Sequence, residues 1–213
     1  GGTLNTGTYS LTASKLGLSA GTLTGTGNLS VTSDFNYTGG TLATTFYDVS
    51  LTRASGNTFN VGNLMTLGAA HNITLTAAGG DLNVSTNGIA KTTGGDATLT
   101  LNATGNVNIS SNITSSGTGV GKLDMVFNAN TDSSGTETTN LTTTTLNANG
   151  GAISVPGAFS LGSGTATINS AMTLGGTGTW SGGTLTGTGS LTVANGATLT
   201  LNGGTKTLGT LPI

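Results

Sequence analysis

The chain has 213 residues, of which 6% are charged and 4% aromatic, and it carries a formal net charge of −2 and no cysteine. Without cysteine there is no disulfide framework and no thiol site, and a charge so near zero argues against nucleic acid as a partner. The sequence has no charged-then-apolar leader and no run of 18 apolar residues, so we expect no membrane insertion by this segment.

The first part of the chain contains a repeat. Corners rich in glycine and threonine occur at residues 1–4, 21–23 and 39–42, about 20 residues apart, and the pattern returns at 182–185 and 203–205. A period of this length, with short strands between small-residue corners, is typical of a solenoid whose stacked coils share one core.

Aliphatic residues in the middle of the chain alternate with threonine and asparagine. Within ATLTLNATGNVNI, Leu99, Leu101, Val107 and Ile109 fall on one face. This period of two predicts strands with one buried side, and branched threonine suits the outer side. A flexible Gly/Ser/Thr linker, the competing interpretation of this composition, has no reason to keep such a period.

Together these patterns predict an all-β protein, a β-solenoid with coils of about 20 residues, in a single segment over residues 1–213. Each coil is expected to hold two or three short strands. Like residues lie above one another in a parallel stack, so we expect threonine and asparagine to form hydrogen-bonded ladders and repeated charges to be avoided. Residues 115–145 hold four of the twelve charged residues, and we expect looped or irregular coils there.

Residues 70–151 resemble the repeat region of filamentous-haemagglutinin-type bacterial adhesins. The resemblance rests on Ala-Thr-Leu-Thr-Leu, then Gly-Asn-Val-Asn-Ile, then Gly-Lys-Leu with a hydrophobic Asn-Ala strand, and an Asn-Gly-Gly corner. The stretch GTWSGGTLTGTGSLTV also resembles autotransporter and two-partner-secretion passengers. The family's Asn-Pro motifs are missing, because neither Pro156 nor Pro212 follows an asparagine. The resemblance implies a right-handed parallel β-helix, secreted to the cell surface of a Gram-negative-type bacterium.

The function that the resemblance implies is non-enzymatic: the structural shaft of a surface adhesin for host or biofilm attachment, with host or matrix glycans or proteins as partners. Two alternatives stay open. A self-assembling extracellular fibre subunit would stack copies end to end through open solenoid edges. An ice-binding solenoid would align Thr-x-Thr motifs on one face, and Thr-Leu-Thr occurs at irregular intervals, at 22–24, 74–76, 98–100, 184–186 and 198–200.

Candidate catalytic and metal-binding residues are few and scattered. Asp34 and Asp48 are 14 residues apart and Asp81 and Asp96 are 15 apart, so neither pair matches the coil period. We therefore predict no catalytic residues and no cofactor. His71 has no second histidine or cysteine to complete a metal site. The Gly-Gly-Asp sequences at Asp81 and Asp96 lack the tandem Gly-Gly-x-Gly-x-Asp pattern of calcium-binding β-rolls, so we predict corners there and no metal site.

Aromatic residues gather between positions 35 and 59. Exposed rings there could stack on sugars, but we expect most of them to fill the core, and the sequence alone identifies no ligand-binding residue. The gathered aromatic residues are Phe35, Tyr37, Phe46, Tyr47 and Phe59.

Trp180 is expected to fill a corner or an end of the solenoid. Eight Asn-x-Ser/Thr triplets would allow glycosylation, at Asn28, Asn36, Asn72, Asn83, Asn102, Asn108, Asn112 and Asn140.

Overall fold

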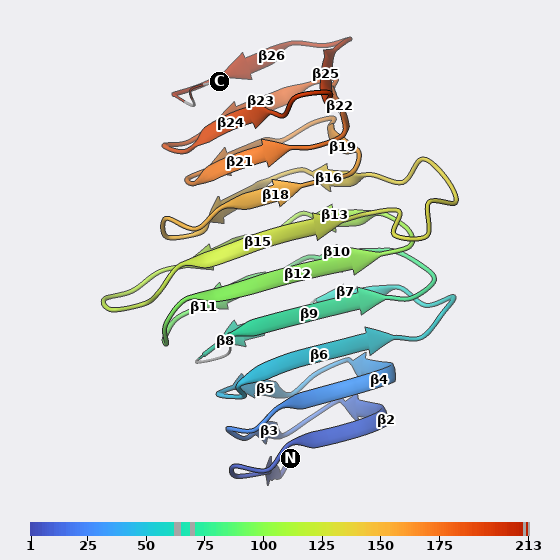
Figure 1. Cartoon of the computed structure of the whole chain (residues 1–213), viewed down its shortest axis with the longest axis vertical. Coiled ribbons are helices and arrows are strands. Elements are labelled where there is room, and N and C mark those ends of the chain that lie inside the picture. Colours follow the sequence, from blue (N-terminus) through green and yellow to red (C-terminus); the bar gives the residue numbers. More distant parts are fainter. Residues whose placement is uncertain (62–64, 69–70, 211, 213) are drawn as a thin grey trace.

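The structure, a computed structural model, describes residues 1–61, 65–68, 71–210 and 212. The chain winds as a right-handed parallel β-helix of about nine turns, roughly 22 residues apart. Figure 1 shows the coils stacked in chain order between the two ends of the molecule. The predicted all-β solenoid is confirmed, with coils slightly longer than expected. In the described residues no helix is long and apolar enough to cross a membrane.

Three parallel sheets form the wall of the solenoid. Sheet I contains β1 (Thr3–Asn5), β3 (Thr22–Thr24), β5 (Thr41–Thr44), β8 (Met65–Leu67), β11 (Ile89–Lys91), β14 (Ile113–Ser115), β17 (Thr144–Asn147), β20 (Thr165–Ile168), β23 (Gly183–Thr186) and β26 (Lys206–Leu208). Sheet II contains β2 (Leu11–Leu18), β4 (Leu29–Tyr37), β6 (Asp48–Arg53), β9 (Asn72–Ala77), β12 (Ala97–Ala103), β15 (Leu123–Asn128), β18 (Ile153–Val155), β21 (Ala171–Leu174) and β24 (Ser190–Val193). Sheet III contains β7 (Phe59–Val61), β10 (Leu82–Val84), β13 (Val107–Ile109), β16 (Thr139–Leu141), β19 (Phe159–Leu161), β22 (Thr177–Trp180) and β25 (Thr198–Leu201).

Alternation along the strands places the apolar side chains inside the coil. In β12, Leu99 is fully buried, whereas Thr98 and Thr100 on either side of it lie on the partly exposed outer face. Parallel register repeats this arrangement from coil to coil, because Leu99 pairs with Ile73 of the preceding coil and Met125 of the next. The buried apolar residues consequently form one column that runs along the solenoid axis.

Coil length changes along the chain. Thr22 pairs with both Thr3 and Thr41, which sets an interval of 19 residues in the first coils. These coils have two strands each, because sheet III begins only at β7, and their sheet II strands β2 and β4 are the longest of the described part, with eight and nine residues. The prediction of two or three strands per coil is confirmed.

The longest coil lies in the middle of the chain. Ile113 of β14 pairs with Leu146 of β17, an interval of 33 residues. Two loops account for the extra length, at residues 116–122 and 129–138, on either side of β15. Both loops project from the wall of the solenoid in Figure 1. Residues 115–145 thus contain β15 of sheet II and β16 of sheet III in full and the start of β17 in sheet I, with the additional residues in the two loops.

Candidate functional site

Aspartate side chains hold neighbouring coils together. In five of the six aspartates an Oδ1 oxygen accepts a hydrogen bond from a backbone N–H in the next coil. We call these contacts the aspartate clamps. Their distances are 3.3 Å for Asp34 and Ala54, 3.1 Å for Asp48 and Asn72, 2.7 Å for Asp81 and Asn106, 2.9 Å for Asp96 and Lys122, and 2.8 Å for Asp124 and Ala152.

The clamps explain why the two aspartate pairs considered from sequence are not brought together as acid–base pairs. Asp48 begins β6, whereas Asp34 lies toward the end of β4 and bonds the Arg53 guanidinium at 2.8 Å. Asp81 precedes β10 in sheet III, and Asp96 precedes β12 in sheet II. Within the described residues, no group of three or more histidine, cysteine, aspartate or glutamate side chains could hold a metal ion.

Asparagine amides form a ladder along the outer face of sheet III. The Asn83 amide donates to Asn60 Oδ1 at 2.9 Å, Asn108 donates to Asn83 at 2.8 Å, and Asn140 donates to Asn108 at 2.8 Å. The predicted amide ladder is therefore confirmed. Three of its members belong to Asn-x-Ser/Thr triplets, and the nitrogen that would carry a glycan is the donor in each rung.

Most of the gathered aromatic rings lie in the core, as predicted. Phe35, Phe46 and Phe59 are at most 2% exposed, and Tyr37 is 8% exposed with its hydroxyl donating to the Gly40 carbonyl oxygen at 3.2 Å. Burial raises the pKa of the Tyr37 phenol, and a backbone hydrogen bond at Leu42 opposes that shift. These four rings therefore pack against other core residues.

Trp180 belongs to the core as well. Its side chain is buried in β22, and the indole N–H donates to the Gly182 carbonyl oxygen at 2.9 Å, at the corner that leads into β23. The indole thereby satisfies its one donor inside the corner that it packs against.

Tyr47 is the exception among the gathered rings, because 54% of it is exposed. Its ring meets the exposed His71 imidazole edge to face, with 4.2 Å between the ring centroids and 81° between the planes. The pair lies at the start of β6 and β9, directly before Asp48 and Asn72. Beside it, the outer face of sheet II has a depression of about 290 Å³, lined by Asn28, Leu29, Ser30, Asp48, Val49, Ser50, Asn72 and Thr74.

Lys91 places an amine inside the solenoid wall. The residue is fully buried at the end of β11, and its Nζ donates to the carbonyl oxygens of Thr93 at 2.5 Å and Gly68 at 3.4 Å. Burial lowers the pKa of the ammonium below its ordinary 10.5, and the Asp96 carboxylate partly opposes this shift. The two carbonyls replace part of the hydration that the cation loses.

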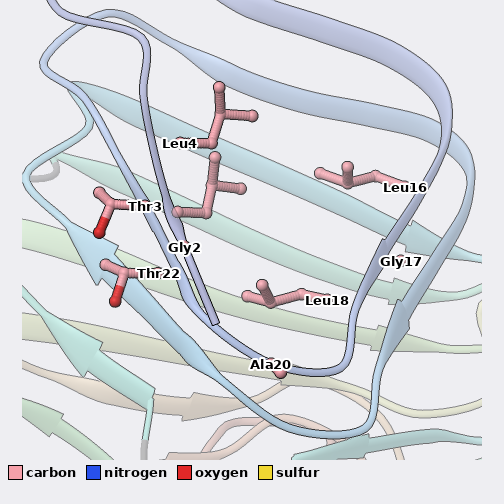
Figure 2. A pocket seen from close by; sticks show the side chains of 9 residues that line it. Gly2, Thr3, Leu4, Leu16, Gly17, Leu18, Ala20 and Thr22 are labelled. Atoms are coloured by element: carbon pink, nitrogen blue, oxygen red, sulfur yellow. The ribbon is translucent and has the colours of Figure 1, made fainter.

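The first coil ends in an apolar hollow of about 340 Å³. Figure 2 shows the side chains of Leu4, Leu16 and Leu18 around it, between β1 and β2. Leu4 is 54% exposed, whereas Leu18 and Leu23 are buried. Leucine side chains of the first coil therefore line the hollow, next to the buried leucines of the core column.

Threonine pairs align on part of sheet I. Thr165 pairs with Thr184, Thr167 with Thr186, and Thr145 with Thr167, which gives a short outward array over β17, β20 and β23. The threonine array does not continue into the coil before β17. The position opposite Thr145 there is Asn112, whose amide oxygen accepts a hydrogen bond from the backbone N–H of Thr145. The five Thr-Leu-Thr sequences themselves are distributed over all three sheets.

The sequence analysis missed both the aspartate clamps and the Tyr47–His71 pair. A signal for the clamps was present, since Asp48, Asp81 and Asp96 stand at or just before the start of a strand. No comparable signal marked the ring pair, because Tyr47 and His71 come together only through the length of one coil. Searches against models of protein families, curated proteins and solved structures find no match to this chain.

Proposed function

We propose that this chain is a stiff segment of the shaft of a secreted bacterial surface adhesin, without catalytic activity. The observation that carries the proposal is the use made of the acidic side chains: five of the six aspartates clamp one coil to the next. Each clamp joins two coils through a hydrogen bond to a charged acceptor, which is stronger than a bond between neutral groups. The acidic side chains of this chain thus contribute mainly to the stacking of the coils.

Two further features support a shaft. The core column runs along the axis through about nine coils, which at about 4.8 Å per coil gives a rod on the order of 40 Å long. Residues 70–151 resemble the repeats of filamentous-haemagglutinin-type adhesins, and this resemblance supports the assignment to a bacterial surface. A stacked core of this kind provides stiffness without any disulfide.

Immunogold labelling of the source cells with antibodies against the chain tests the proposal. We expect label on intact cells, displaced outward from the membrane, and loss of that label after external protease treatment. A matched internal protein serves as the control for cell integrity. Label that appears only after the cells are permeabilised would refute a surface shaft.

A further inference from the structure

Next to the exposed Tyr47 ring lies a depression with free polar groups, because Asp48 and Asn72, which line it, directly follow Tyr47 and His71 along the chain. We infer that it is a binding site for a neutral sugar ring, such as a hexopyranose unit of a glycan. The lining of the depression comes from the coils of β4, β6 and β9, and Tyr47 directly precedes Asp48, the first lining residue of the β6 coil. This inference does not depend on the shaft proposal, since a sugar site can lie on a rod of any function.

The Tyr47 ring contacts a side chain of the next coil but faces a glycine on the preceding coil. The backbone N–H of Tyr47 donates to the Gly27 carbonyl oxygen at 2.9 Å, and the His71 N–H donates to the Tyr47 carbonyl oxygen at 2.7 Å. Tyr47 therefore lies between a glycine on the preceding coil and the imidazole on the next. The imidazole supports the ring, whereas Gly27 has no side chain that could cover it. An open, supported aromatic surface is what the C–H face of a sugar packs against.

Glycine at position 27 is required by the stacking of the coils. A Cβ there would lie 2.5 Å from the carbonyl carbon and oxygen of Tyr9 in the preceding coil. Close packing of the two backbones thus excludes a side chain from this position. As a result, no side chain projects from position 27 of the coil next to Tyr47, which is 54% exposed.

The floor of the depression presents hydrogen-bonding groups that the protein leaves unused. Asp48 Oδ1 accepts both the backbone and side-chain N–H groups of Asn72, each at 3.1 Å, which leaves Asp48 Oδ2 and Asn72 Oδ1 as acceptors. In the described part of the chain, the side-chain amide of Asn28 and the hydroxyls of Ser30 and Ser50 make no hydrogen bond within the protein. Donors and acceptors at this density match the hydroxyl groups of a pyranose ring.

The negative charge of the Asp48 carboxylate favours a neutral ligand over an anionic one. Among the described residues that line the depression, Asp48 is the charged one and none is a cation. A carboxylate or sulfate on the ligand would therefore meet like charge without a compensating group. Uronic acids and sulfated sugars are consequently expected to bind less well than neutral hexoses.

Saturation-transfer NMR with the 213-residue chain tests the site. The probes are the methyl glycosides of glucose, galactose and mannose, with methyl glucuronide as the charged comparison. We expect at least one neutral glycoside to bind with a Kd of about 1 mM, the range typical of so small a ligand. Stronger saturation of the sugar C–H protons than of the methyl group would indicate stacking on the ring.

Three variants decide whether the signal belongs to this site. Tyr47→Ala should weaken binding by about tenfold or more, whereas Tyr47→Phe, which keeps the ring, should stay within about threefold. Leu201→Ala is the control, because Leu201 is 60% exposed but lies in β25 of sheet III, away from the depression on sheet II. An equal loss in Leu201→Ala, preference for the glucuronide, or no binding of any neutral glycoside would each overturn the inference. None of these results would affect the surface labelling that tests the shaft.

Discussion

At the scale of single residues, the burial of Lys91 makes the stability of the fold depend on pH. Its pKa is lowered in the folded chain because burial disfavours the ammonium form. Between that lowered value and the ordinary 10.5, the unfolded chain binds more protons than the folded one, so stability rises with pH across this window. Below the window the cost of burying the charge is present in full. This cost is softened by the carbonyl oxygens of Thr93 and Gly68.

Replacing Lys91 by methionine, which has a similar length and no charge, should remove this dependence. The free energy of unfolding of the wild type, minus that of Lys91→Met, should rise as pH increases toward 10.5. The raised pKa of Tyr37 acts in the opposite sense above pH 10.0, but it is common to both proteins and cancels. Urea unfolding over a pH series measures the difference, with exposed Lys15→Met as the control. A difference that does not vary with pH contradicts the prediction.

At the scale of strands and corners, the aspartate clamps are the contacts that the fold uses repeatedly. Asp81 is the most engaged of them, since its carboxylate also accepts the side-chain amides of Asn106 at 3.3 Å and Asn108 at 3.5 Å. The Asn108 amide belongs to the ladder of sheet III as well. A change at this corner is therefore transmitted to the ladder.

We expect Asp81→Ala to lower the free energy of unfolding by about 2 kcal/mol, because it leaves the Asn106 N–H without its acceptor. Asp81→Asn keeps an oxygen at this position and should cost about half as much. Asp132→Ala is the control, since within the described residues the Asp132 carboxylate bonds Ser134 of its own loop and no other residue, and it should stay within about 0.5 kcal/mol. Equal losses in Asp81→Ala and Asp132→Ala, measured by chemical denaturation, would contradict the role of the clamp.

The sequence predicted the strands better than their partners. The alternation around Leu99 and Leu101 identifies a strand and its buried face, because both depend on neighbouring residues alone. A clamp such as Asp96 to Lys122 depends on the number of residues in the intervening coil, which varies from 19 to 33. The number of residues in each coil also determines that the wall has three sheets and that Tyr47 meets His71. Local patterns therefore specify the elements, and coil length specifies which residues meet.

At the scale of the whole molecule, the solenoid should tolerate changes in multiples of a coil. Gly164 and Gly183 occupy equivalent corners, with φ values of 78° and 82°, and Thr165 pairs with Thr184. Removal of residues 165–183 would join Gly164 to Thr184 and preserve the corner conformation. The next coil could then stack directly on β17, β18 and β19.

Deletion of 165–183 should leave a cooperatively unfolding β protein. Deletion of 165–174, about half of the same coil, should abolish or strongly weaken cooperative unfolding, because it puts the following strands opposite corners instead of strands. Circular dichroism with thermal unfolding distinguishes the two. Similar behaviour of both deletions would contradict a stack of independent, register-matched coils.

The direction of the inter-coil hydrogen bonds has a mechanical consequence. In a parallel solenoid these bonds lie along the axis, so a pull on the two ends loads them one coil at a time rather than all together. Each coil of roughly 22 residues would release on the order of 70 Å of extended chain when it detaches. A tethered rod of this kind would lengthen in discrete steps under tension and absorb sudden loads, and optical-tweezer traces would record those steps.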